Sequence, residues 1–179
     1  MQPQAQPLLS ERLDLVPLRV EHAREMAAVL SDPALHTFIG GSPSTPEALR
    51  ARYERLVTGS PDPARTWWNW VLALRDTGAL VGTVQATLAE GGRLAEIAWM
   101  VGTPWQGRGL ATEAARTLVD GLREQGVRTV VAHIHPEHHA SAAVAAAAGL
   151  TPTGEEQDGE VRWRLVTPGG QYTQGTFRK

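Results

Sequence analysis

The chain has 179 residues, of which 42% are apolar and 20% charged, and its net charge at neutral pH is −2. This length and composition predict one globular domain, and the charge offers no clustered basic face for nucleic acid. The sequence holds no cysteine, which excludes disulfides, thiolate metal sites and a cysteine nucleophile. No run approaches the roughly 20 apolar residues that span a bilayer, and the first residues lack the features of a secretory signal. We therefore expect a cytoplasmic protein without nucleic-acid or membrane partners.

Hydrophobic periodicity predicts a strand and two helices in the first third of the chain. Residues 11–18 alternate apolar and polar side chains, as a half-buried strand does. Residues 20–30 carry apolar side chains at helical spacing. A second helix is expected within 42–59, because Thr45 can cap its start and Gly59 suits its end.

Three consecutive strands and a long helix are predicted in the middle of the chain. The strands are expected at 67–76, 79–89 and 94–102, separated by short turns that contain glycine. Leucine and alanine at helical spacing then predict a helix that begins at Leu110 and stops at Gly126.

The last third predicts a strand at 128–134, a short alanine-rich helix at 140–149 and a strand at 160–166. The whole order predicts an α+β domain over residues 1–167. Its sheet is expected to be mostly antiparallel, with about six or seven strands, about four flanking helices and one parallel crossover around the long helix. Residues 168–179 are expected to form a polar, loosely held C-terminal tail.

The stretch TPWQGRGLATEA, residues 103–114, places two glycines and an arginine where the long helix begins. A helix start presents unpaired N–H groups and the positive end of a dipole, which attract phosphate, and glycine lets a ligand approach the backbone. A Walker loop is excluded because the stretch lacks Gly-Lys-Ser/Thr. A dinucleotide fingerprint is excluded because Thr112 stands in place of its third glycine. A tight turn and a cradle for another phosphate ligand remain as alternatives.

The segment QGRGLA, residues 106–111, matches the Q/R-x-x-G-x-G/A acetyl-CoA signature of the GNAT superfamily of N-acetyltransferases. In that family the signature follows a strand and opens a long helix, as it does here. LAEIAWMV, residues 94–101, resembles the strand of histone acetyltransferases of this superfamily in which the acid is the general base. HPEHHASAAVAAAAGLTP, residues 135–152, resembles the RimJ/RimL-type ribosomal-protein alanine acetyltransferase branch, as do residues 10–23 and 31–41.

This resemblance covers about residues 8–166 and implies the GNAT fold. It also implies that a primary amine attacks the thioester of acetyl-CoA, the cosubstrate, directly. The pyrophosphate would lie on the glycine turn, and the pantetheine would lie along the strand edge, in the manner of an added strand. The residues implied in cofactor binding are Met100, Val101, Gln106, Gly107, Arg108, Gly109, Leu110, Ala111 and Thr112.

The resemblance also suggests catalytic groups. Glu96 is the candidate general base, with a strand carboxylate paired to an arginine as the alternative. Many members use a tyrosine to protonate the leaving thiolate, but that position is Ala145 here, so the general acid is left open. The branch points to Ser141, which could equally be a helix cap. His138 stands where asparagine is usual, and it is either a titrating group beside the thioester or an ordinary polar residue.

The remaining predictions about the site concern a histidine cluster and two aromatic residues. No metal is expected at the cluster, because two of its histidines share a strand face, the others lie in a turn, and Glu137 is the only carboxylate nearby. Its members are His133, His135, His138 and His139. Phe38 and Trp70 are hypothesised to shape the acceptor pocket, with core packing as the alternative for each.

The acceptor is expected to be a small-molecule amine or a protein N-terminus, since the sequence suggests no acidic groove for basic tails. A non-catalytic acyl-CoA-binding sensor of the same fold is the alternative, because the usual tyrosine is missing. A nicotinamide-dependent dehydrogenase is a rival that the failed fingerprint disfavours. Oligomeric state is left open, with a homodimer among the alternatives.

Overall fold

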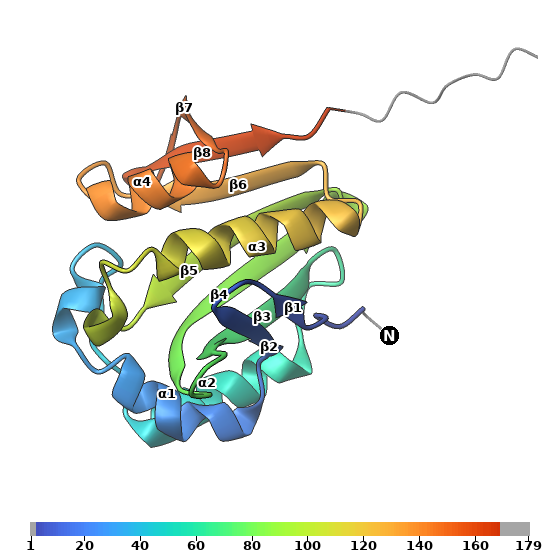
Figure 1. The fold of residues 1–179 in the computed structure, drawn as a ribbon. Helices are drawn as coiled ribbons and strands as arrows, with labels where there is room; N and C mark the ends of the chain where they lie inside the picture. Colours follow the sequence, from blue (N-terminus) through green and yellow to red (C-terminus); the bar gives the residue numbers. More distant parts are fainter. Residues whose placement is uncertain (1–2, 169–179) are drawn as a thin grey trace, which may run out of the picture.

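The computed structural model describes residues 3–168, which form one eight-stranded sheet with helices on both faces (Figure 1). Apart from Pro168, the expected tail at 168–179 lies outside the described residues. The strands are β1 (Leu8–Leu9), β2 (Leu13–Pro17), β3 (Thr66–Leu74), β4 (Leu80–Ala89), β5 (Leu94–Val101), β6 (Thr129–Ile134), β7 (Thr151–Gln157) and β8 (Glu160–Val166). The helices are α1 (Ala23–Val29), α2 (Pro46–Thr58), α3 (Leu110–Glu124) and α4 (His139–Ala147).

The α+β class and the mostly antiparallel sheet are confirmed, with slightly more strands than expected. The spatial order is β1-β2-β3-β4-β5-β6-β8-β7, and the pair β5–β6 is its parallel step. β7 was not predicted from the sequence. Its residues, TPTGEEQ, include proline and glycine and are almost wholly exposed, so the segment lacks the apolar alternation of a half-buried strand. β1 was not predicted because two residues are too few to show an alternating pattern.

The caps that the sequence predicts are present. The hydroxyl oxygen of Thr45 accepts the N–H of Ala48 at 3.1 Å at the start of α2, and Gly59 follows its end with φ 98°. The first helix is shorter than expected, since residues 20–22 form a 3₁₀ turn and α1 begins at Ala23.

Two apolar layers fix the helices to opposite faces of the sheet. On one face, α3 buries a leucine and alanine stripe against the sheet, as its spacing predicts. On the other face, α1 and α2 pack a smaller cluster that includes Met26, Leu49 and Tyr53 against β3 and β4. The sheet therefore has a face covered by α3 and α4 and a face covered by α1 and α2.

The parallel step between β5 and β6 is short. Only Leu94, Ala95 and Glu96 of β5 pair with β6, whereas β4 pairs with β5 from Leu94 to Val101. β5 and β6 therefore diverge after Glu96. This divergence opens the sheet beside the turn that leads into α3.

Candidate functional site

A cavity of about 770 Å³ lies where β5 and β6 diverge. Its wall comes from the end of β5, the glycine turn, the start of α3, the end of β6 and the start of α4. All the predicted cofactor-binding residues except Arg108 line it. The structure thus brings together in one cavity residues that the sequence assigned to cofactor binding.

The glycine turn is shaped so that its backbone is accessible. Gly107 and Gly109 have φ of 77° and 75°, in the left-handed region that favours glycine. Gly109 is the N-cap of α3 and offers no side chain to cap the first turn, so the N–H groups of that turn stay available for a ligand. The side-chain amide of Gln106 donates to the Val101 carbonyl at 2.9 Å, which ties the turn to the end of β5.

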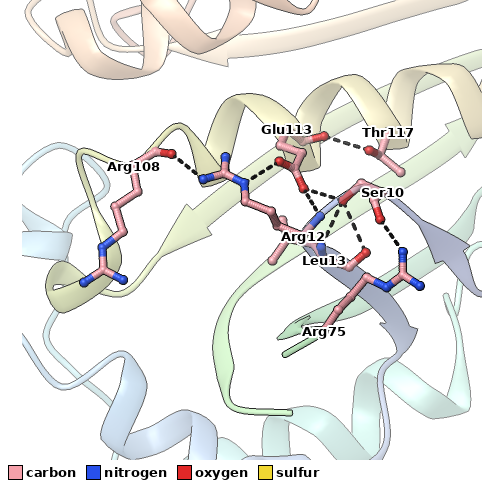
Figure 2. Close-up of polar contacts among 7 residues, drawn as sticks. All are labelled: Ser10, Arg12, Leu13, Arg75, Arg108, Glu113 and Thr117. Atoms are coloured by element: carbon pink, nitrogen blue, oxygen red, sulfur yellow. Dashed lines mark hydrogen bonds and ion pairs between the residues drawn. The ribbon is translucent and has the colours of Figure 1, made fainter. Parts of the chain in front are cut away.

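A polar network from the N-terminal strands holds this turn from outside (Figure 2). Arg12 donates from Nε to Glu113 at 2.8 Å and from Nη1 to the Arg108 carbonyl at 2.9 Å. The Ser10 hydroxyl donates to the same Glu113 carboxylate at 2.6 Å. Burial by itself would raise the pKa of Glu113, but the hydrogen bonds from Ser10 and Arg12 outweigh it and lower that pKa. Arg108 therefore contributes its backbone to the network rather than a side chain to the cavity wall.

Glu96 lies at the point of divergence and is paired with a histidine, not with an arginine. Nδ1 of His133 donates to Oε1 of Glu96 at 2.8 Å. The other ring nitrogen of His133 is buried and has no hydrogen-bond partner among the described residues. His133 lines the cavity, whereas Glu96 is not part of its lining. The contact directs the Nδ1 proton of His133 to the Glu96 carboxylate, which can only accept.

The start of α4 brings Ser141 and His138 into contact, and Phe38 packs on His138. The Ser141 hydroxyl lies 3.3 Å from His138 Nε2, while His138 itself occupies the N-cap position, so Ser141 does not cap the helix. The ring of Phe38 stacks on His138 with centroids 4.5 Å apart and lies 5.1 Å from that of His135. Burial, and then the charge of His135, lowers the pKa of His138, which favours its neutral form. All four residues line the larger cavity.

The histidine cluster does not form a ligand set in the structure. His135 accepts the backbone N–H of Glu137 at 3.1 Å, and His139 is exposed at the first position of α4. Within residues 3–168, no three His, Asp or Glu side chains are grouped so that they could hold a metal ion. Across the same residues, no helix is long and apolar enough to cross a bilayer.

A second cavity, of about 250 Å³, lies between the α1–α2 pair and strands β3 to β5. It shares Ile39, Ala98, Trp99 and Met100 with the larger cavity, so the two meet at β5. Because side chains alternate along a strand, Glu96, Ala98 and Met100 point to the same face of the sheet. The exposed carboxylate of Glu96 and the second cavity therefore lie on the face that α1 and α2 cover.

The two aromatic residues predicted to shape the acceptor pocket differ in position. Phe38 lines the larger cavity. Trp70 borders the smaller one, but its side chain is only 2% exposed and belongs to the core on the α3 face. Its indole N–H donates to the Gln6 carbonyl at 2.8 Å, and its ring meets that of Trp68 edge to face. This burial favours the core alternative for Trp70, and its contact with an acceptor stays a prediction.

The family model described as "Acetyltransferase (GNAT) domain" matches residues 12–151. The chain belongs to the GNAT acetyltransferase family, as the motifs predicted. Among curated proteins, none matches the sequence.

Solved structures share the fold over nearly their whole length. A GNAT-family acetyltransferase from Bacillus anthracis is 20% identical, with a TM-score of 0.76, and the alignment covers 90% of this chain and 98% of that one. RimL, a ribosomal L7/L12 alpha-N-protein acetyltransferase solved with coenzyme A, is 17% identical, with the same coverage and TM-score. Spermidine N-acetyltransferase from Vibrio cholerae, solved with CoA and spermine, is 16% identical, with a TM-score of 0.71 and coverage of 88% and 97%. Identities this low show the fold, and the RimJ/RimL-type branch stays a prediction.

Proposed function

We propose that this protein is an acetyl-CoA-dependent N-acetyltransferase that acts on the primary amine of a small molecule or a protein N-terminus. The observation that carries the proposal is the cavity between the diverging strands β5 and β6, which joins the glycine turn to Ser141 and His138. Membership of the GNAT family supports the same activity.

The residues of the cavity fit acetyl-CoA. The N–H groups between Gly107 and Ala111, at the positive end of α3, would hold the pyrophosphate. The edge of β5 at Met100 and Val101 has no pairing with β6, so it can pair with the extended pantetheine. Two relatives with the same fold, RimL and the spermidine acetyltransferase, are solved with coenzyme A.

The transfer requires a neutral amine. An alkylammonium has a pKa near ~10, so it must lose a proton before its nitrogen can attack the thioester carbonyl. We assign Glu96, oriented by its hydrogen bond with His133, as the group that accepts this proton directly or through water. The C–N bond then forms as the C–S bond breaks.

The leaving thiolate needs a proton, and the residue at the usual tyrosine position, Ala145, is fully buried. Ser141 and His138 are the polar side chains at the start of α4 that line the cavity and contact each other. We assign this pair to bind and orient the thiol group and to deliver its proton.

A thiol-release assay tests the proposal. Purified protein, acetyl-CoA and a panel of amines and N-terminal peptides should give CoA thiol and an acetylated amine in equal amounts. Thermal unfolding with CoA, run in parallel, reports binding without turnover. Stabilisation by CoA together with turnover supports the proposal, whereas stabilisation without turnover of any amine supports the acyl-CoA sensor instead.

A further inference from the structure

The smaller cavity has polar and cationic walls without a carboxylate. Arg52 and His36 are the residues of its wall that carry or can acquire positive charge, and no Asp or Glu of the described chain lines it. The remaining polar groups are neutral and belong to Ser44, Tyr53, Asn69, Thr83 and Gln85. An acceptor in this cavity therefore meets positive charge at one end, on α2, and no compensating negative charge in the wall.

Arg52 is free to bind a ligand. Among residues 3–168, no carboxylate lies within ion-pair distance of its guanidinium, whereas Arg50 on the same helix is paired with Glu54 at 3.4 Å. A guanidinium presents a planar set of donors that matches a carboxylate or a phosphate. The free cation is thus next to a cavity and not committed to the fold.

Tyr53 supplies a second, independent sign of a missing partner. Its side chain is 3% exposed, and its hydroxyl is buried without a hydrogen-bond partner among the described residues. Burial raises the pKa of Tyr53 to about 12, although the charge of Arg52 acts in the opposite direction. A buried hydroxyl without a partner costs free energy, and a bound oxygen acceptor would remove that cost.

We infer that the acceptor is an amine that carries a carboxylate or phosphate group, which Arg52 binds in the smaller cavity with a hydrogen bond from Tyr53. The inference rests on the proposed function. The amine end then points to β5, where the two cavities share Ala98 and Met100, beside the face that carries Glu96. The anionic group and the reacting nitrogen are held at opposite ends of one small molecule.

The same charges disfavour a polycation. A polyamine would place its second ammonium near Arg52 with no carboxylate in the wall to offset the repulsion. The fold relative from Vibrio cholerae that is solved with spermine therefore indicates the architecture of this chain and not its acceptor.

The test measures kcat/KM by thiol release at saturating acetyl-CoA for matched amines. ω-Amino acids of increasing length are compared with alkylamines of the same length, and aminoalkyl phosphates with the matching amino alcohols, with spermidine as the polycation. The first comparison tests whether a carboxylate on the acceptor raises kcat/KM, and the second tests the same for a phosphate. We expect the anionic member to be preferred by about ten- to a hundredfold, the size of a charge-assisted hydrogen bond.

Three variants test whether Arg52 and Tyr53 cause the preference for anionic amines. Arg52→Gln should bring this preference close to one and leave the KM for acetyl-CoA unchanged. Arg55→Gln, which removes an exposed arginine of α2 outside the cavity, is the matched control and should keep the preference. Tyr53→Phe should reduce kcat/KM for the anionic amine without lowering the unfolding temperature, since the hydroxyl has no partner in the free protein. If Tyr53 served only the fold, Tyr53→Phe would instead leave kcat/KM for the anionic amine unchanged, because phenylalanine keeps the buried ring.

The outcomes distinguish a failure of the anionic-acceptor inference from a failure of the proposed acetyltransferase function. If amines are acetylated without regard to charge, if spermidine is best, or if Arg52→Gln keeps the preference, this inference is overturned while the proposed function stands. If CoA stabilises the protein but no amine is acetylated, the proposed function is wrong and the inference falls with it.

Discussion

Replacing Gly109 with valine tests whether the turn before α3 holds the cofactor. At φ 75° a β-branched residue is strained, with a cost of about 1–3 kcal/mol. A Cβ at this position would meet only Arg12 Nη2, at an ordinary contact distance of 3.5 Å. The protein itself therefore leaves room for the Cβ, and the strain on this left-handed backbone should displace the N–H groups that the turn offers to a ligand.

Gly126 provides a matched control at the opposite end of α3. It also has a positive φ, 93°, and a Cβ there would meet nothing within 4 Å. The helix of 15 residues, roughly 22 Å long at 1.5 Å per residue, separates the two positions. Both valine variants should thus share the backbone strain, which corresponds to a fall in Tm of about 2–12 °C for a domain of this size.

The assay is thermal unfolding with and without CoA. At a CoA concentration about 100 times Kd, binding stabilises the folded state by about 2.7 kcal/mol, or about 5–11 °C. The parent protein and Gly126→Val should show this rise, and Gly109→Val should not. If Gly109→Val is stabilised by CoA as much as the parent, the cofactor is held elsewhere.

Three further predictions address the catalytic groups and the core. Glu96→Gln should lower kcat by roughly 10²-fold at neutral pH with partial recovery at high pH, because the amide cannot accept the proton of the amine, and an unchanged pH–rate profile would leave solvent as the base. Trp70→Ala should reduce the free energy of unfolding by about 3–5 kcal/mol in denaturant titrations, because the indole is 2% exposed. A raised acceptor KM with normal stability would contradict that core role. Because the pKa of His138 is lowered in the folded state, the unfolded chain binds more protons below pH 6.5, so stability should fall as pH falls from 6.5 towards the folded-state pKa. His138→Asn should flatten this slope, and an unchanged slope would mean that another group causes it.

Local sequence patterns were sufficient for most elements. The expected strands and the long helix lie within two residues of the observed bounds, because alternation and helical spacing reflect which face each segment buries. The glycine turn was also predictable, since Gly107 and Gly109 do adopt the left-handed backbone that their residue type favours.

Long-range partners were not predictable from such patterns. Glu96 and His133 meet because β5 and β6 are parallel neighbours, and no local spacing connects residues 37 positions apart. The contact between Arg12 and Glu113 spans 101 positions and depends on β2 lying near the start of α3. Strand parity could have suggested the first pair once a parallel crossover was assumed, whereas nothing in the sequence indicated the second.

Trp70 illustrates the same limit within one strand. Alternation correctly places Trp68 and Trp70 on one face of β3, and both are buried there. Whether that face meets α3 or the α1–α2 pair depends on how the sheet is covered. The tertiary arrangement places the two indoles on the α3 side, opposite the face that carries Glu96 and Ala98.

The divergence of β5 from β6 explains why cofactor and acceptor effects should be separable. Beyond Glu96, β5 keeps β4 on one edge and loses its strand partner on the other, so the free edge belongs to the larger cavity. The smaller cavity approaches the same strand from the face covered by α1 and α2, and both cavities reach Met100. A change at Gly109 therefore acts on one side of β5 and a change at Arg52 on the other. Only at the shared wall, where the amine would meet the thioester, should a substitution alter both KM values.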